Sequence, residues 1–363
     1  MTEDPNRLSD EPDRLATIVA RLFAGQSGNH DVLLRNGSGS ALRAGADAQD
    51  DCAVFALRGD QELVVGSDYV RGARFRLYEY GLLDNYDIGY YLVAANISDI
   101  AAMGARPIGM LTVIRYPATM TDAEFGTVLH GIRDACARFG APNVGGDIGG
   151  ADALILSGTA LGVCLPGQAL LRSGARPGDL LCVTGPTGIA GAAMSYFRTG
   201  RSSAEIDRKY RDTLLASWTR PQARVREGAL MGDSRLVTSC LDTSDGLKAA
   251  VETIATASRV GITVDERLIE PTPEVAAVSD FLGVDPLPIV FGDSVDFELV
   301  FTLPPNNLDP LTDLFADQHL AFSVIGQVTT AQNVVLRRRN GSHVPLPGKT
   351  WRHAPEHASV HRQ

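Results

Sequence analysis

Seven aspartates lie in short segments where turns or strand ends are expected, several of them beside Gly, Ser or Thr. Carboxylates that converge from separate loops repel one another unless cations lie between them. Mg²⁺ takes oxygen ligands and is commonly shared between carboxylates and phosphate oxygens. Because these segments hold few Lys or Arg residues, they suit a site for a metal-bound nucleotide; the set is Asp50, Asp51, Asp68, Asp99, Asp147, Asp242 and Asp245.

Asp99 has the most unusual surroundings of the seven. It is the only charged residue between Asp87 and Arg106, inside the apolar stretch "IGYYLVAANISDIAAMGA". A buried carboxylate without a partner normally takes up a proton. Asp99 must therefore either reach water or face a positive charge.

A purely structural explanation is available for most of the set. Aspartate is a common helix N-cap and turn residue. A cap accounts for Asp245 in "SDGL", and a Gly-rich turn accounts for Asp147 in "VGGDIGG". Asp99 fits this explanation less well because caps do not lie in the middle of a helix. On the residues alone, a metal site and a set of structural aspartates both stay open.

Other nucleotide or nucleophile motifs are missing from the sequence. It has no G-x-x-x-x-G-K-[ST] segment, no G-x-G-x-x-G after a predicted strand and no Ser nucleophile elbow. The Gly-rich "TGPTGIAGA" precedes a predicted helix and could present N–H groups to an anion. Tight packing between helix and strand explains that segment equally well.

Composition narrows the class of protein. A chain of 363 residues suggests two domains. The net charge of -10 argues against nucleic acid as the main partner, and no apolar run is long enough for a membrane helix. The acidic, polar N-terminus lacks a secretory core, so we expect a cytoplasmic protein. Five scattered cysteines without a C-x-x-C pair indicate reduced thiols.

The elements that must position the aspartates follow from local patterns. The sequence predicts a strand over 62–70, ending near Asp68, and a buried helix over 87–103 that carries Asp99. A second helix begins at Thr121 with a capping box to Glu124. Strands and helices do not alternate strictly, which favours an α+β fold over a doubly wound sheet.

Two Pro-Gly pairs bracket residues 166–179 and indicate a domain boundary. The predicted organisation is therefore a disordered tail, an N-terminal domain, a C-terminal α+β domain and a C-terminal tail, with bounds 1–14, 15–165, 166–345 and 346–363.

Seven segments resemble thiamine-monophosphate kinase and occur in the expected order over residues 45–305. They are "QDDCAVF", "SDYVRGARF", "NISDIAAMGARP", "GGDIGG", "LRSGARPGDLLCVTGPTG", "LDTSDGL" and "DFELVF". That family is similar to aminoimidazole-ribonucleotide synthetase. The resemblance implies two α+β domains and a homodimer built around a barrel of N-terminal strands. It also implies ATP bound through several Mg²⁺ ions, with direct phosphoryl transfer to a small-molecule acceptor.

The resemblance also implies roles for individual residues. Asp99, Asp147 and Asp245 would be catalytic. The nucleotide would be bound by Ser67, Gly146, Asp147, Arg172 and Ser244. The metal ligands would be Asp51, Ser67, Asp68, Asp99, Asp147, Asp242 and Asp245.

The acceptor side departs from the family pattern. Arg74 stands where the family has His, and Val295 stands where it has Glu. Trp351 could still stack on a ring of the acceptor. The primary expectation is thiamine-phosphate kinase activity, or the same transfer to a different acceptor. The alternatives are an ATP-dependent synthetase that activates an amide or carboxyl oxygen, and a non-catalytic nucleotide-binding protein.

Overall fold

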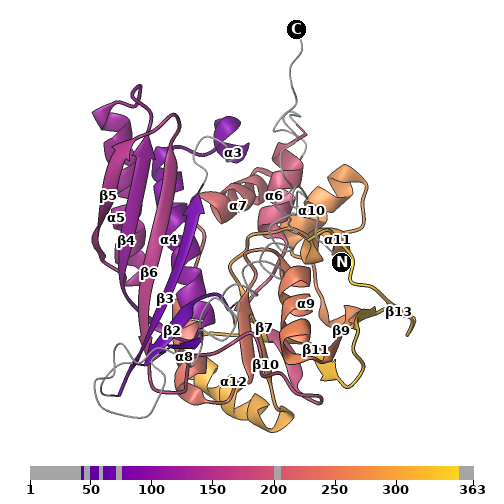
Figure 1. Ribbon diagram of the computed structural model, residues 1–363. Helices are drawn as coiled ribbons and strands as arrows, with labels where there is room; N and C mark the ends of the chain where they lie inside the picture. The colour runs from indigo at the N-terminus through magenta and orange to yellow at the C-terminus, as the bar shows by residue number, and fades with distance from the viewer. Residues whose placement is uncertain (1–41, 45–49, 57–59, 71–75, 200–205, 351–363) are drawn as a thin grey trace, which may run out of the picture.

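Two β-sheets, each with its own helices, make up the protein (Figure 1). The computed structural model describes residues 42–44, 50–56, 60–70, 76–199 and 206–350. The expected N-terminal tail 1–14 lies outside these ranges, as does the part of the expected C-terminal tail after residue 350.

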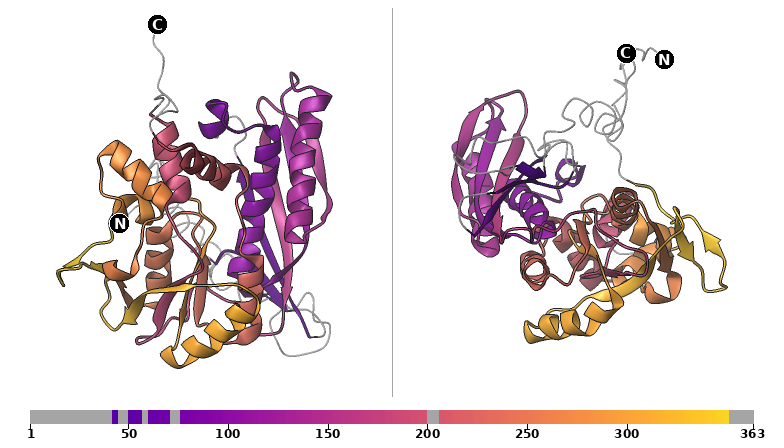
Figure 2. Two further views of the ribbon diagram at one scale, coloured as in Figure 1. Left: turned by 180° about the vertical axis from the view of Figure 1, so that it is seen from behind. Right: turned by 60° about the horizontal axis from the view of Figure 1, so that its bottom comes forward.

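The first sheet has six strands in the order β1-β2-β3-β6-β4-β5. β4 and β5 are parallel, and the other neighbours are antiparallel. The helices of this half lie on one face of the sheet (Figure 2). The elements are β1 (Leu42–Ala44), β2 (Ala53–Ala56), β3 (Glu62–Val70), α3 (Arg76–Glu79), α4 (Asn85–Ala102), β4 (Arg106–Tyr116), α5 (Asp122–Phe139), β5 (Asn143–Gly150) and β6 (Ile155–Cys164).

Helix α4 is the central element because it packs against β3 and β6, α5, and the helices α7 and α8 of the second half. Its sequence is apolar on all sides, as expected for a helix covered on all sides. A Cβ at Gly89 would lie 2.2 Å from the carbonyl oxygen of Val128, so glycine permits the close approach of α5. Asp84 and Asp87 form a capping box at its start.

The second sheet has seven strands in the order β13-β12-β9-β11-β7-β10-β8. Only β9 and β12 are parallel neighbours among its described pairs. The strands are β7 (Leu180–Val183), β8 (Ser239–Asp242), β9 (Gly261–Asp265), β10 (Leu299–Leu303), β11 (Ser323–Thr329), β12 (Val334–Arg337) and β13 (His343–Val344). The helices are α6 (Ile189–Phe197), α7 (Arg208–Thr219), α8 (Val225–Ser234), α9 (Leu247–Ser258), α10 (Pro273–Leu282), α11 (Leu287–Phe291) and α12 (Leu308–Asp317), with 3₁₀ turns η3 (Glu266–Leu268) and η4 (Pro305–Asn307).

The predicted α+β class is confirmed, and so are several local predictions. β3 spans the expected residues 62–70, and α5 begins with the Thr121–Glu124 capping box. One local prediction is wrong, because residues 143–150 form the edge strand β5 rather than a turn. A Cβ at Gly146 would lie 1.7 Å from the carbonyl oxygen of Thr112, so glycine allows this strand to pair with β4.

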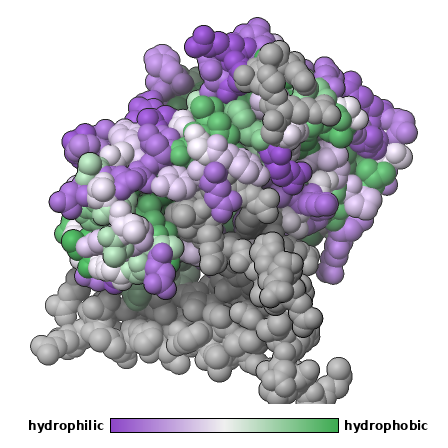
Figure 3. All heavy atoms as spheres, turned by 90° about the horizontal axis from the view of Figure 1, so that it is seen from above, coloured by the Kyte–Doolittle hydropathy of each residue, from purple (hydrophilic) through white to green (hydrophobic). Residues whose placement is uncertain are grey.

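Hydrophilic residues dominate the face seen from above, with smaller apolar patches between them (Figure 3). Among the described helices, none is both long and apolar enough to cross a membrane.

Candidate functional site

Asp51, Asp99 and Asp242 meet between the two halves of the protein. Asp99 lies in the last turn of α4, and Asp242 is the last residue of β8. Gly66 on β3 marks the meeting point, because a Cβ there would lie 3.4 Å from the carbonyl oxygen of Asp51 and 3.7 Å from the Cβ of Asp99. Segments far apart in the sequence thus bring their carboxylates to one place.

Electrostatics confirm that these carboxylates act on one another. Burial raises the pKa of Asp99 well above its usual range, and the charges of Asp242, Asp51 and Asp68 raise it further. Burial also raises the pKa of Asp51 to about 8, in spite of the opposing charge of Arg172. These carboxyls therefore tend to keep a proton unless a cation compensates their charge.

Arg172 is the cation that faces this group. Its Nη2 donates to Asp51 Oδ1 at 2.5 Å, and its Nε lies 3.5 Å from Asp50 Oδ1. Asp51 Oδ2 is buried and has no hydrogen-bond partner in the described part of the chain. One guanidinium therefore compensates only part of the charge of Asp50, Asp51, Asp99 and Asp242.

The motif "NISD" directs each polar side chain to a different element. Asn96 Oδ1 accepts a hydrogen bond from the backbone N–H of Asp68 on β3 at 2.9 Å. Ser98 Oγ donates to Asp242 Oδ2 on β8 at 2.5 Å. Ser244 donates to the other oxygen of Asp242, through its Oγ at 2.7 Å and its N–H at 3.2 Å. Sequence reasoning missed Asn96 and Ser98, although both flank Asp99 in the same motif.

Asp245 lies on the loop that leads into α9, and the loop over 292–296 packs against it. Gly246 has φ +92, and a Cβ there would lie 1.9 Å from the carbonyl oxygen of Gly292. The N-cap of α9 is Gly246, so Asp245 does not cap this helix as the structural explanation proposed. Burial raises the pKa of Tyr91, and the charges of Asp68, Asp242, Asp245 and Asp296 raise it further.

Ser67 and Asp147 lie on the opposite face of the first sheet. Side chains alternate along a strand, so Ser67 and Asp68 point to different faces. Ser67 Oγ donates to the carbonyl oxygen of Gly158 at 2.5 Å. Asp147 is 67% exposed and accepts from Arg115 Nη2 at 2.7 Å, which lowers its pKa. Within one chain, these two residues and Gly146 on β5 are not brought to Asp99.

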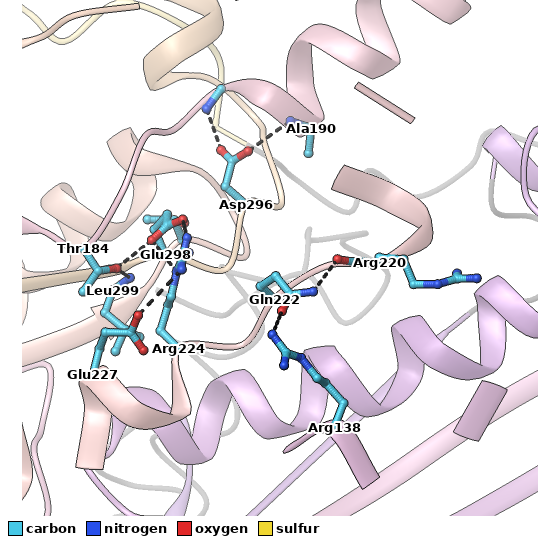
Figure 4. A network of polar contacts seen from close by, with 12 residues as sticks. Arg138, Thr184, Ala190, Arg220, Gln222, Arg224, Glu227, Asp296, Glu298 and Leu299 are labelled. Carbon is cyan, nitrogen blue, oxygen red and sulfur yellow. Dashed lines mark hydrogen bonds and ion pairs between the residues drawn. The ribbon is translucent and has the colours of Figure 1, made fainter. Parts of the chain in front are cut away.

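The Gly-rich segment before α6 already binds a carboxylate of the chain itself (Figure 4). Asp296 accepts from the N–H groups of Gly188 at 2.6 Å and Ala190 at 3.0 Å. The possibility that this segment receives a ligand anion is therefore not supported, because the helix N-terminus is occupied from within. Sequence reasoning missed this contact, which joins residues more than 100 positions apart.

The structure describes only one of the three residues that we predicted on the acceptor side. Arg74 and Trp351 lie outside the described residues. Val295 is half-buried and packs against the hydrophobic core. Gly348 lies beside Gly292, and the charge of Lys349 acts on Asp293. The C-terminal segment thus passes the 292–296 loop shortly before residue 351.

The carboxylates of Asp51, Asp99 and Asp242 suit a cation in their charge and in the type of donor atom. All its donors are oxygen atoms, which hard cations such as Mg²⁺ prefer. The buried, unpartnered Asp51 Oδ2 has an open coordination position. No three His, Cys, Asp or Glu residues of the described ranges are already arranged as a metal cluster. Asp51 instead accepts a hydrogen bond from Arg172, and Asp242 accepts hydrogen bonds from Ser98 and Ser244.

Both halves of the chain match known family models. The model for the AIR synthase related protein N-terminal domain matches residues 49–164, and the model for the C-terminal domain matches residues 176–339.

Similar proteins extend over most of the chain. The thiamine-monophosphate kinase of Pyrococcus horikoshii is 32% identical over 84% of this chain and 91% of its own length. That of Bacillus subtilis is 31% identical over 84% and 92%. The crystal structure of thiamine-monophosphate kinase from Stenotrophomonas maltophilia K279a gives a TM-score of 0.68 at 26% identity, covering 84% of this chain and 92% of that chain. AaThiL complexed with AMPPCP and TMP gives a TM-score of 0.71 at 22% identity, with coverage of 84% and 91%.

The similarity extends over both halves of the chain and includes the fold. The chain belongs to the thiamine-monophosphate kinase family of AIR-synthase-related proteins.

Proposed function

We propose that this protein transfers the terminal phosphoryl group of ATP to thiamine phosphate, giving ADP and thiamine diphosphate. The observation that carries the proposal is the group Asp51, Asp99 and Asp242, which holds more negative charge than Arg172 compensates. The similarity of the chain to thiamine-monophosphate kinases supports the identity of the reaction.

The carboxylates of both halves would hold Mg²⁺, and the proposed ligands are Asp51, Asp68, Asp99, Asp242 and Asp245. Bound Mg²⁺ would neutralise phosphate oxygens and orient them, which supplies most of the catalysis in phosphoryl transfer. Arg172 would exchange Asp51 for a phosphate group, since its guanidinium can form a charge-assisted pair with either. Ser244 lies beside Asp242 and would donate to the phosphates of ATP.

Three residues predicted to bind the nucleotide lie away from Asp99 within one chain, namely Ser67, Gly146 and Asp147. In this proposal they take part in a nucleotide site only in a homodimer. Ser67 and Asp147 lie on the face of the first sheet that carries no helix of this half, and the apolar residues Tyr69, Leu111 and Ile155 are exposed on the same face. Large apolar side chains exposed on one face of a sheet favour association. A second copy that covered it would surround Asp147 with protein and allow it to join a nucleotide site. We also propose a cytoplasmic location.

The chain departs from the family pattern at the residues expected to bind the acceptor. Val295 packs against the core and offers no charge to a ligand, whereas a carboxylate there would accept a hydrogen bond. Arg74 would favour an acidic acceptor. This combination supports transfer to a different, more anionic acceptor as the second candidate.

The test is to incubate the purified protein with ATP, Mg²⁺ and thiamine phosphate, and to identify products by mass spectrometry. A panel of other small anionic metabolites would replace thiamine phosphate in parallel. We expect ADP and a stable phosphorylated acceptor, with activity lost in EDTA and restored by Mg²⁺. Free phosphate with a dehydrated or ring-closed product would identify a synthetase, and ATP binding without turnover would identify a non-catalytic protein.

A double variant tests the acceptor side. Val295→Glu combined with Arg74→His should improve the use of thiamine phosphate, measured as kcat/KM, if the pocket has changed its acceptor. An unchanged kcat/KM would show that other residues determine the acceptor.

A further inference from the structure

Ser98 makes a direct side-chain contact between the two halves at the carboxylate site. Its hydroxyl donates to Asp242 Oδ2 at 2.5 Å, across 144 positions of sequence. Ser98 is fully buried and Asp242 is 4% exposed, so water does not compete for this hydrogen bond. The second oxygen of Asp242 accepts from Ser244, so the rotation of the carboxylate is restricted at both oxygens.

The position of Ser98 on α4 explains why this bond matters for the neighbouring residue. Successive helical residues are about 100° apart, so Ser98 and Asp99 leave the helix in different directions. Asp99 lies beside Gly66 of the first half, while Ser98 binds Asp242 of the second. One turn of α4 therefore sets the position of Asp242 relative to Asp99, although the two charges repel each other.

We propose that Ser98 is a positioning residue, whose hydroxyl holds Asp242 against Asp99 and so keeps the carboxylates of both halves in one cation site. Ser98 contacts neither metal nor nucleotide in this account and acts through Asp242 alone. The inference rests on the proposed function for its connection to Mg²⁺, but the coupling between Ser98 and Asp242 belongs to the chain itself. Partners that orient a ligand in this way typically change metal affinity by about 10–100-fold when removed.

The experiment compares Ser98→Ala with Ser279→Ala. Ser279 on α10 is also a buried helical serine, 2% exposed. Its hydroxyl donates to the carbonyl oxygen of Val284 at 2.6 Å. Calorimetric titration with Mg²⁺ in the presence of a non-hydrolysable ATP analogue gives the dissociation constant of each variant. We expect Ser98→Ala to weaken Mg²⁺ binding by about 10–100-fold and Ser279→Ala to leave it unchanged. An equal effect of the two substitutions would overturn the proposal.

A double-mutant cycle with Asp242→Ala gives a second readout, without metal. The thermal unfolding midpoints of Ser98→Ala, Asp242→Ala and the double variant are measured in EDTA. We expect strongly non-additive shifts, because the two residues share one hydrogen bond. Additive shifts would overturn the inference. If the wild-type protein transferred no phosphoryl group, the proposed function would fail, whereas this cycle would still decide the role of Ser98.

Discussion

Two groups of buried and half-buried carboxylates lie in the same protein and differ in how their charge is compensated. Glu298 is buried, receives both Nε and Nη2 of Arg224, and accepts from Thr184 Oγ1 at 2.7 Å (Figure 4). Asp296 beside it accepts two backbone N–H groups. Burial raises the pKa of both carboxyls, and hydrogen bonds from their partners oppose that effect.

The group around Asp99 is compensated only in part, by Arg172 at Asp51 and by two serines at Asp242. Asp51, Asp99 and Asp242 face one another, and within the described residues no hydrogen bond or ion pair reaches the carboxylate of Asp99. Asp99 is half-buried, and a partly desolvated carboxylate without a protein partner is costly unless water or a ligand compensates its charge. The comparison assigns a structural role to the Glu298 group, and it supports the proposal that the Asp99 group receives a cation.

The largest expected effect is on stability at the compensated group. Glu298→Gln would leave the half-buried Arg224 with Glu227, at 3.6 Å, as its remaining carboxylate partner among the described residues. We expect the free energy of unfolding to fall by about 3 kcal/mol, measured by urea denaturation. The Mg²⁺ dependence of the remaining activity should stay unchanged. A change in that dependence would remove the distinction between the two groups.

Asp99→Asn should lower the activity and leave the stability of the protein intact, which is the reverse of the effect expected for Glu298→Gln. We expect ATP turnover to fall by about 100-fold or more, which corresponds to about 2.7 kcal/mol. Since the substitution removes a charge that Asp51 and Asp242 repel, the unfolding midpoint in EDTA should stay the same or rise. A near-normal rate would exclude Asp99 from the cation site. A large loss of stability in EDTA would place Asp99 in the structural class.

Arg172→Gln tests the partial compensation of the Asp51 charge. The variant loses the ion pair to Asp51, so we expect the free energy of unfolding in EDTA to fall by about 1–2 kcal/mol. Added Mg²⁺ should restore more of this stability in the variant than it adds to the wild-type protein. Arg176→Gln on the same connecting segment, whose side chain is exposed, is the matched control. Equal responses of the two variants to Mg²⁺ would contradict the exchange proposed for Arg172.

A pH dependence in metal-free buffer is the effect that we expect to be smallest over any single pH unit. The pKa of Asp51 rises from 3.8 to about 8 on folding, so the folded protein binds a proton that the unfolded chain releases. Stability from this group is therefore fully present below about pH 4 and is lost as the pH rises to about 8. We expect a slope of about 1 kcal/mol per pH unit between these limits, from denaturation in EDTA, and a smaller slope in Asp51→Asn. The same slope in both proteins would assign the effect to other groups.

Local chemistry was sufficient to predict much of the fold. The apolar run before Asp99 predicted α4, and the Thr121–Glu124 pair predicted the start of α5. β5 was not predictable in this way, because its glycines resemble a turn until β4 is placed beside them. A strand of this kind is defined by its pairing partner rather than by its own residues.

The site was predictable by residue type but not by arrangement. The motifs identified Asp51, Asp99 and Asp242 as candidates, and the structure brings them together. The contacts Ser98–Asp242, Arg172–Asp51 and Asp296–Gly188 each join positions more than 100 residues apart. Such contacts depend on how distant segments pack, within the second half for Asp296–Gly188 and between the halves for Ser98–Asp242, and no local pattern records this packing. The placement of Asp147 on the opposite face from Asp99 has the same origin.

A crystal structure with Mg²⁺ and a non-hydrolysable ATP analogue tests the central claim most directly. The account predicts metal ions between the phosphates and the carboxylates of Asp51, Asp99 and Asp242, with Arg172 moved from Asp51 to a phosphate oxygen. Nucleotide bound elsewhere, with Arg172 still paired to Asp51 and no metal at Asp99, would contradict it.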